Sequence, residues 1–118
     1  MPKKKLVTII RDCLEEMKAQ DTVILDIRDK SSIADYMVVS SGTSTRHVSS
    51  IADKLQRTIK TSSYKNVKVE GLQNCDWVLI DALDVIVNIF KPEVREFYMI
   101  EKIWSENLIV DGKKSIGK

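Results

Sequence analysis

The chain has 118 residues, 43% hydrophobic and 31% charged, which suits one globular domain with a single modest core. Its net charge of +2 is too small for a whole-protein field that would attract nucleic acid, although lysines gather at both ends. Cys13 and Cys75 lie far apart without a CxxC pair, which argues against a metal site or a disulfide. Neither a secretory signal nor an apolar run of about 20 residues is visible, so we expect a cytoplasmic protein without a membrane partner.

The first half of the chain alternates between helical and strand patterns. Residues 6–17 have apolar side chains at helical spacing and predict an amphipathic helix of about four turns. Residues 22–27 and 36–40 have the pattern of buried strands, with a polar loop between them. Residues 44–61 predict a second helix, which a hydroxyl of Thr43 or Ser44 would cap.

The second half predicts three more strands. Residues 67–69 alternate, and two apolar runs at 77–80 and 85–90 are parted by four residues, as in a strand pair. Pro92 cannot donate to a sheet and begins predicted helical turns that reach residue 104. The anchors of these turns would be Val94, Tyr98 and Ile103.

This order of elements predicts an α/β fold: a single domain with a mixed five-stranded sheet flanked by helices. The segment between residues 40 and 67 is long enough for the crossover that parallel strands require. We place the domain at residues 1–105 and expect residues 106–118 to be a flexible basic tail.

Three places could carry chemistry. The turn at 42–45 puts Gly42 and hydroxyls before a helix, where an anion could bind, but the nucleotide motifs GxxxxGK[ST] and GxGxxG are absent. His47 is the only histidine, and sequence spacing assigns it no catalytic partner. Asp81 and Asp84 flank a strand turn, where they could hold Mg²⁺ or bond their own backbone, and the pattern favours the turn role.

The strand at 77–81 offers a surface for recognition. Alternation puts Trp77, Leu79 and Asp81 on one face, and a face that ends in Asp is not expected to be all core. Arg95 and Tyr98 follow close to the end of the same hairpin, and Trp, Tyr and Arg are enriched at interface hot spots. That Trp77 and Tyr98 instead complete the core stays open.

Three blocks of the sequence resemble the ribosomal silencing factors of the Iojap-like family. They are 26–36 (DIRDKSSIADY), 41–53 (SGTSTRHVSSIAD) and 70–104, which includes DWVLID and PEVREFY. Together they span nearly the whole predicted domain, and long blocks in the right order are more specific than one short motif. Asn88 and Lys91 stand where the family often has His and Gln, and Lys91 would alter the charge at the contact edge.

The resemblance implies a nucleotidyltransferase-like topology without established catalysis or a cofactor. It implies a homodimer that binds the large ribosomal subunit through its fourteenth protein, blocks joining of the small subunit, and lowers translation when nutrients are scarce. The basic ends could add a minor contact with ribosomal RNA. Alternatives are a nucleotidyltransferase-like enzyme that uses Asp81, Asp84 and the turn at 42–45, and a dimeric adaptor with another partner. The partner-binding residues that the resemblance assigns are Trp77, Tyr98, Leu79, Asp81, Glu93 and Arg95.

Overall fold

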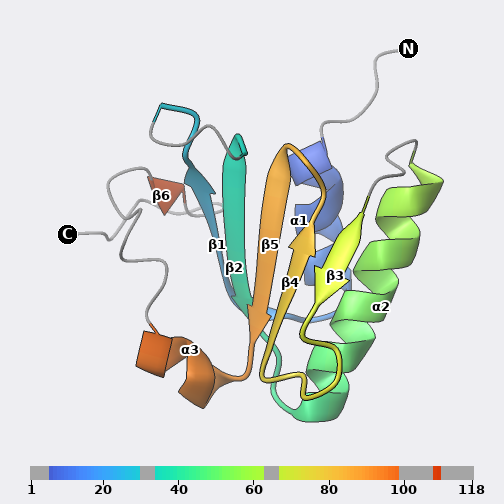
Figure 1. Cartoon of the computed structure of the whole chain (residues 1–118), viewed down its shortest axis with the longest axis vertical. Helices are drawn as coiled ribbons and strands as arrows, with labels where there is room; N and C mark the ends of the chain where they lie inside the picture. The colour runs from blue at the N-terminus through green and yellow to red at the C-terminus, as the bar shows by residue number, and fades with distance from the viewer. Residues whose placement is uncertain (1–5, 30–33, 63–66, 99–107, 110–118) are drawn as a thin grey trace.

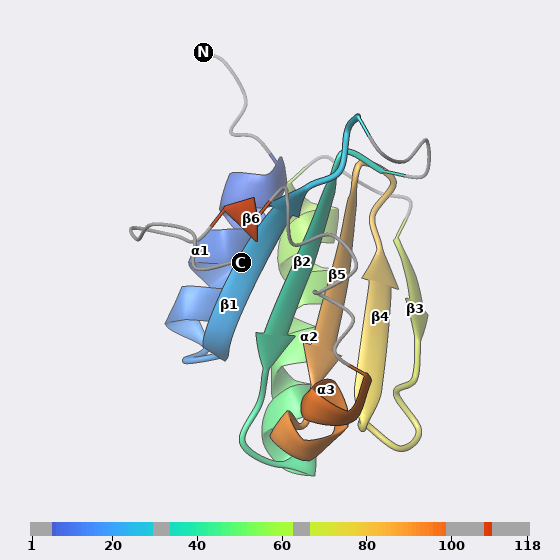
Figure 2. The same ribbon diagram turned by 90° about the vertical axis from the view of Figure 1, so that its left-hand side faces the viewer.

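The computed structural model describes residues 6–29, 34–62, 67–98 and 108–109. They form one mixed sheet with α1 and α2 on one face, and α3 at one end of the other face (Figures 1 and 2). No helix in these residues is long and apolar enough to cross a membrane. The elements in chain order are α1 (Leu6–Glu16), β1 (Gln20–Asp26), β2 (Tyr36–Ser41), α2 (Thr45–Thr61), β3 (Lys68–Glu70), β4 (Trp77–Asp81), β5 (Val85–Phe90), α3 (Pro92–Tyr98) and β6 (Leu108–Ile109).

The strand order in the sheet is β3-β4-β5-β2-β1-β6. The central pair, β2 and β5, is parallel, and the other neighbouring strands are antiparallel. The predicted crossover is present, because α2 carries the chain from the middle of the sheet to its β3 edge (Figure 1). The five predicted strands and the mixed sheet are therefore confirmed.

The sheet has a sixth strand, which lies in the segment predicted to be a flexible tail. Leu108 and Ile109 pair with Leu25 and Ile24 of β1, so the sheet is not limited to five strands. Without β6, this side of β1 would have no partner strand for its backbone groups, and two apolar residues are enough to pair with part of it. The rest of the predicted tail, and the predicted anchor Ile103, lie outside the described residues.

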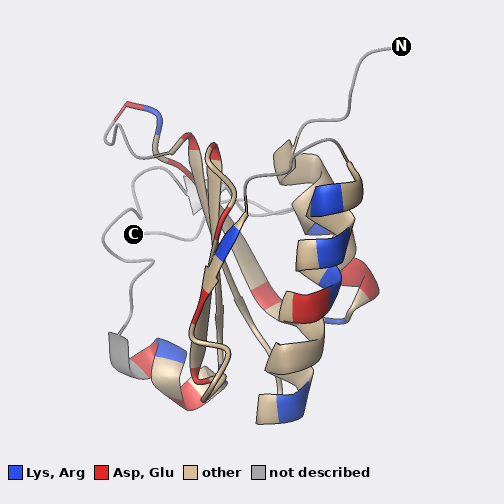
Figure 3. Ribbon diagram, turned by 45° about the vertical axis from the view of Figure 1, so that its right-hand side comes forward, with Lys and Arg blue, Asp and Glu red and all other residues tan. Residues whose placement is uncertain are grey.

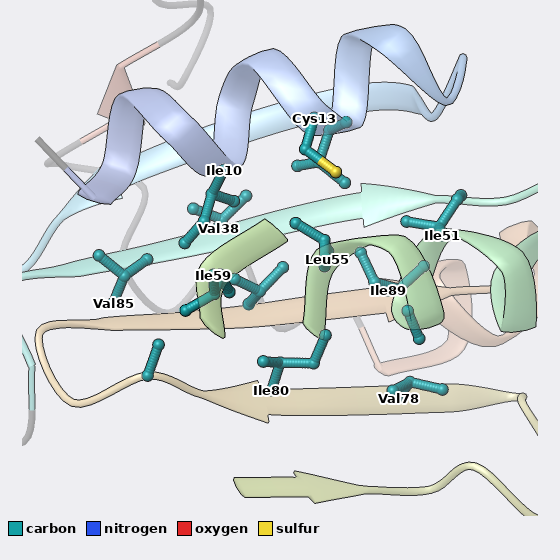
Figure 4. Close-up of a cluster of buried hydrophobic side chains, with 14 of the residues drawn as sticks. Ile10, Cys13, Val38, Ile51, Leu55, Ile59, Val78, Ile80, Val85 and Ile89 are labelled. Atoms are coloured by element: carbon teal, nitrogen blue, oxygen red, sulfur yellow. The ribbon is translucent and has the colours of Figure 1, made fainter. Parts of the chain in front are cut away.

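The core lies on both faces of the sheet. The larger cluster fills the space between the sheet and the helices α1 and α2, where Ile10, Leu55 and Ile80 are fully buried (Figure 4). A second cluster on the other face centres on Leu25 and Phe90. β5 is consequently buried along its whole length, as expected for a strand covered on both faces.

Candidate partner-binding surface

The alternation predicted for β4 is confirmed. Val78 and Ile80 are buried in the larger cluster under α2, whereas Trp77, Leu79 and Asp81 are half-buried and belong to the opposite face. We call the latter three residues, together with Asp76 just before β4, Lys91 just before α3 and Glu93 in the first turn of α3, the Trp77 surface.

Trp77 packs against the second cluster and is also partly accessible at the surface. Its ring packs against Phe90 with a centroid distance of 4.9 Å, and its indole Nε1 donates a 2.9 Å hydrogen bond to Oδ1 of Asn88. Asn88 is fully buried and also donates from Nδ2 to the carbonyl of Val38 at 3.4 Å. The ring is thus fixed in orientation while part of it stays accessible, which suits an anchor for a partner.

Leu79 extends the accessible apolar area beside Trp77. It lies directly opposite Asn88 in the β4–β5 pair and is packed on the margin of the second cluster. Because Trp77 and Leu79 both belong to the paired strand β4 and not to a loop, the geometry of the sheet sets the distance between them.

Asp81 and Asp84 serve the turn between β4 and β5. Oδ1 of Asp81 accepts a 3.0 Å hydrogen bond from the Leu83 N–H, and the Asp84 carbonyl accepts from the N–H groups of Asp35 and Tyr36. The turn role is thereby confirmed for the Asp81 side chain, whereas the Asp84 contacts come from its backbone. No group of three or more His, Cys, Asp and Glu side chains that could hold a metal ion occurs among the described residues.

The rim of the Trp77 surface is acidic. Nζ of Lys91 lies 3.0 Å from Oδ1 of Asp76 and 4.0 Å from Oε2 of Glu93, so its charge is shared between two acids. The hydrogen bond to Asp76 raises the pKa of Lys91 above its ordinary value. Asp81 lies at the opposite end of β4, beside the β4–β5 turn, so the surface as defined carries three acids and one base, with two of the acids at its Lys91 end.

Arg95 differs from its predicted role as a contact residue. It is only 9% exposed, and Nη1 donates a 2.9 Å hydrogen bond to Oγ of Ser41, which joins α3 to the end of β2. Residues two apart on a helix do not share a face, so Arg95 points away from the side of α3 that carries Glu93. Arg95 positions α3. The backbone of Tyr98 ends α3, but its side chain lies outside the described residues.

Two residues that support the site are not among the predicted site residues. One is Asn88, whose position as a polar residue inside an apolar run is the signal of a buried hydrogen-bonding partner. Gly71 has φ +93°, and a Cβ there would lie 2.1 Å from the Trp77 carbonyl oxygen, so the loop before β4 requires glycine.

The turn at 42–45 and His47 have structural partners. Ser44 caps α2 by accepting from the His47 N–H, as predicted. Nδ1 of His47 accepts from the Thr43 N–H at 2.8 Å, and Nε2 donates to the Met17 carbonyl at 2.8 Å. His47 therefore ties the start of α2 to the end of α1.

The comparisons with known proteins identify the family. The family model "Ribosomal silencing factor during starvation" matches residues 1–116. A ribosomal silencing factor RsfS of Zymomonas mobilis is 44% identical over 99 residues, which are 84% of this chain and 74% of that protein. The mouse protein "Mitochondrial assembly of ribosomal large subunit protein 1" is 30% identical over 102 residues, 84% of this chain and 45% of that protein.

The fold agrees with these sequence matches. A crystal structure of a protein from Chromobacterium violaceum superposes with a TM-score of 0.84 at 29% identity, covering 98% of this chain and 97% of that one. The chain belongs to the ribosomal silencing factor (RsfS) family.

Proposed function

We propose that this protein is a translational repressor that binds the large ribosomal subunit and sterically blocks its association with the small subunit. It would thereby lower translation under nutrient limitation. The observation that carries the proposal is the orientation of Trp77, which is half-buried on a paired strand and held there by Phe90 and Asn88. Family membership and the printed name of the mouse relative, which refers to the ribosomal large subunit, support this choice of partner.

The proposed contact is the fourteenth protein of the large subunit, bound by the Trp77 surface. Trp77 and Leu79 would supply the apolar centre of the interface, and Asp81 and Glu93 its charged rim. Tyr98 would extend the contact, with Arg95 holding α3 in place. An acidic rim favours a basic partner surface, because complementary charges speed and orient association.

The proposed mechanism is non-enzymatic and acts in the cytoplasm, with the protein working as a homodimer. A steric blocker requires a rigid surface and a place that the small subunit must occupy. Since the factor and the small subunit would compete for one face of the large subunit, the degree of repression would follow the concentration and affinity of the factor.

The test is sedimentation of the purified protein with separated subunits, followed by a subunit-joining assay. We expect the protein to travel with the large subunit only and to reduce the fraction of joined ribosomes in proportion to its occupancy. Removing two rim acids, Asp76→Asn with Glu93→Gln, should weaken binding and reduce its dependence on salt. The matched control, Glu15→Gln with Glu16→Gln on α1, should bind normally. Absence of the protein from the large-subunit fraction would refute the proposal.

A further inference from the structure

The solvent-facing side of α2 is strongly basic. The helix contains Arg46, Lys54, Arg57 and Lys60 against the single acid Asp53, a net charge of +3, whereas the whole chain has only +2. The rest of the chain is thus net acidic, by one charge. Figure 3 shows blue segments repeated along α2 and red ones on α3 and the strand turns. Among the residues that the structure describes, α2 is therefore a local concentration of positive charge.

Three of these bases lie on one side of the helix. Arg46, Arg57 and Lys60 are exposed, and at 3.6 residues per turn their positions fall within about 60° of one another around the axis. They span roughly 21 Å along the helix at 1.5 Å per residue. The hydroxyls of Ser49 and Ser50 are exposed in the same stretch and can donate hydrogen bonds.

The chemistry of this side selects one kind of partner. The large apolar residues of α2 are buried against the sheet, so its outer side has no apolar stripe with which to enter a membrane. It also has no aromatic anchor of the kind that dominates protein interfaces. What remains is a line of cations with hydroxyls, which fits successive phosphates.

We propose that the outer side of α2 binds the phosphate backbone of RNA. This goes beyond the proposed function, because α2 covers the face of the sheet opposite to Trp77 and Leu79. One molecule would then offer an acidic apolar surface to a protein and a basic surface to RNA. Arg46, Arg57 and Lys60 would contact phosphates, and Asp53, which pairs with Arg57, would limit the affinity.

The experiment is fluorescence anisotropy of a labelled RNA duplex, and of its single strand, titrated with the full-length protein at several salt concentrations. We expect the triple variant Arg46→Gln, Arg57→Gln, Lys60→Gln to flatten the slope of log K against log salt by about one for each residue. Asp53→Asn should bind more tightly than the wild type. Because all four side chains are exposed, each variant should fold normally, which circular dichroism checks.

The matched control removes three positive charges elsewhere, by Arg11→Gln, Lys18→Gln and Arg28→Gln, and should keep most of the binding. Equal losses in the control and in the triple variant would overturn the proposal, because they would show attraction by net charge alone. Two results with the wild-type protein would also overturn it: no measurable binding to RNA, or displacement of the RNA by phosphatidylserine vesicles in a competition experiment. If substitution of the terminal lysines at 3–5, and not of the α2 residues, abolishes binding, the basic end is the RNA surface and α2 is not.

Discussion

The indole N–H of Trp77 donates a 2.9 Å hydrogen bond to the side-chain oxygen of Asn88 across the β4–β5 pair. Asn88 is fully buried, and its Nδ2 donates to the Val38 carbonyl of β2 on its other side. One amide therefore links three strands, β4, β5 and β2, and holds the ring on which the proposed interface depends.

Asn88→Ala should destabilise the protein, because it leaves the indole N–H without this acceptor and opens a small cavity. We expect a loss of about 1–3 kcal/mol in the free energy of unfolding, measured by urea denaturation. Asn88→His, which keeps a ring nitrogen that can accept the hydrogen bond, should lose less. If Asn88→Ala unfolds at the same urea concentration as the wild type, the amide does not hold the ring.

Trp77→Ala should affect binding more than folding. Trp77 is half-buried, so its loss removes the proposed interface anchor and only part of a core side chain. We expect at least a tenfold loss of affinity for the large subunit, measured by sedimentation across a concentration series. Phe90→Ala is the contrasting variant, since Phe90 is fully buried and its loss should cost about 3–5 kcal/mol of stability. A folded Trp77→Ala variant with unchanged affinity would remove Trp77 from the site.

Gly71→Ala should distort the loop that leads into β4. The backbone there has φ +93°, and the added Cβ would meet the Trp77 carbonyl oxygen at 2.1 Å. We expect a loss of about 1–3 kcal/mol in stability together with weaker partner binding, because the loop must move away from Trp77. Gln73→Ala in the same loop, an exposed position, should leave both quantities unchanged. Near-normal stability of Gly71→Ala would mean that the loop adapts without cost.

Local patterns were sufficient to predict most of the fold. The structure confirms three such patterns. The helical spacing in α2 and the alternation in β4 each reflect one buried face, and the apolar run of β5 reflects burial on both faces. β6 could not be predicted, since Leu108 and Ile109 form a strand only because the edge of β1 lies beside them. Tertiary pairing decides such short segments.

The candidate site was predictable in part. Alternation correctly placed Trp77, Leu79 and Asp81 on one face. The burial of Arg95 was not predicted, because its partner Ser41 lies 54 residues away in the sequence and no local pattern records that contact. For the same reason the link between Trp77 and Asn88 required the register of the two strands.

Asp26 and Arg28 should make a small part of the stability depend on pH. Nε of Arg28 donates to Oδ1 of Asp26 at 2.9 Å, and this hydrogen bond lowers the pKa of the Asp26 carboxyl below its ordinary value of 3.8. A carboxyl with a lowered folded-state pKa adds stability that is present above the unfolded-state pKa. That stability is lost as the pH falls from about 3.8 through the lower folded-state value.

In a plot of melting temperature against pH, Asp26→Asn should therefore reduce the slope at acidic pH. The slope near neutral pH should change little. The effect should be small, because the Arg28 side chain is 56% exposed and water screens the pair. Asp26→Asn isolates the ion pair better than Arg28→Gln does, since Arg28 also lies over the Tyr36 ring at 5.4 Å. In a double-mutant cycle the coupling between the two positions should vanish below the folded-state pKa of Asp26. A coupling that persists there unchanged would show that the carboxylate charge is not its source.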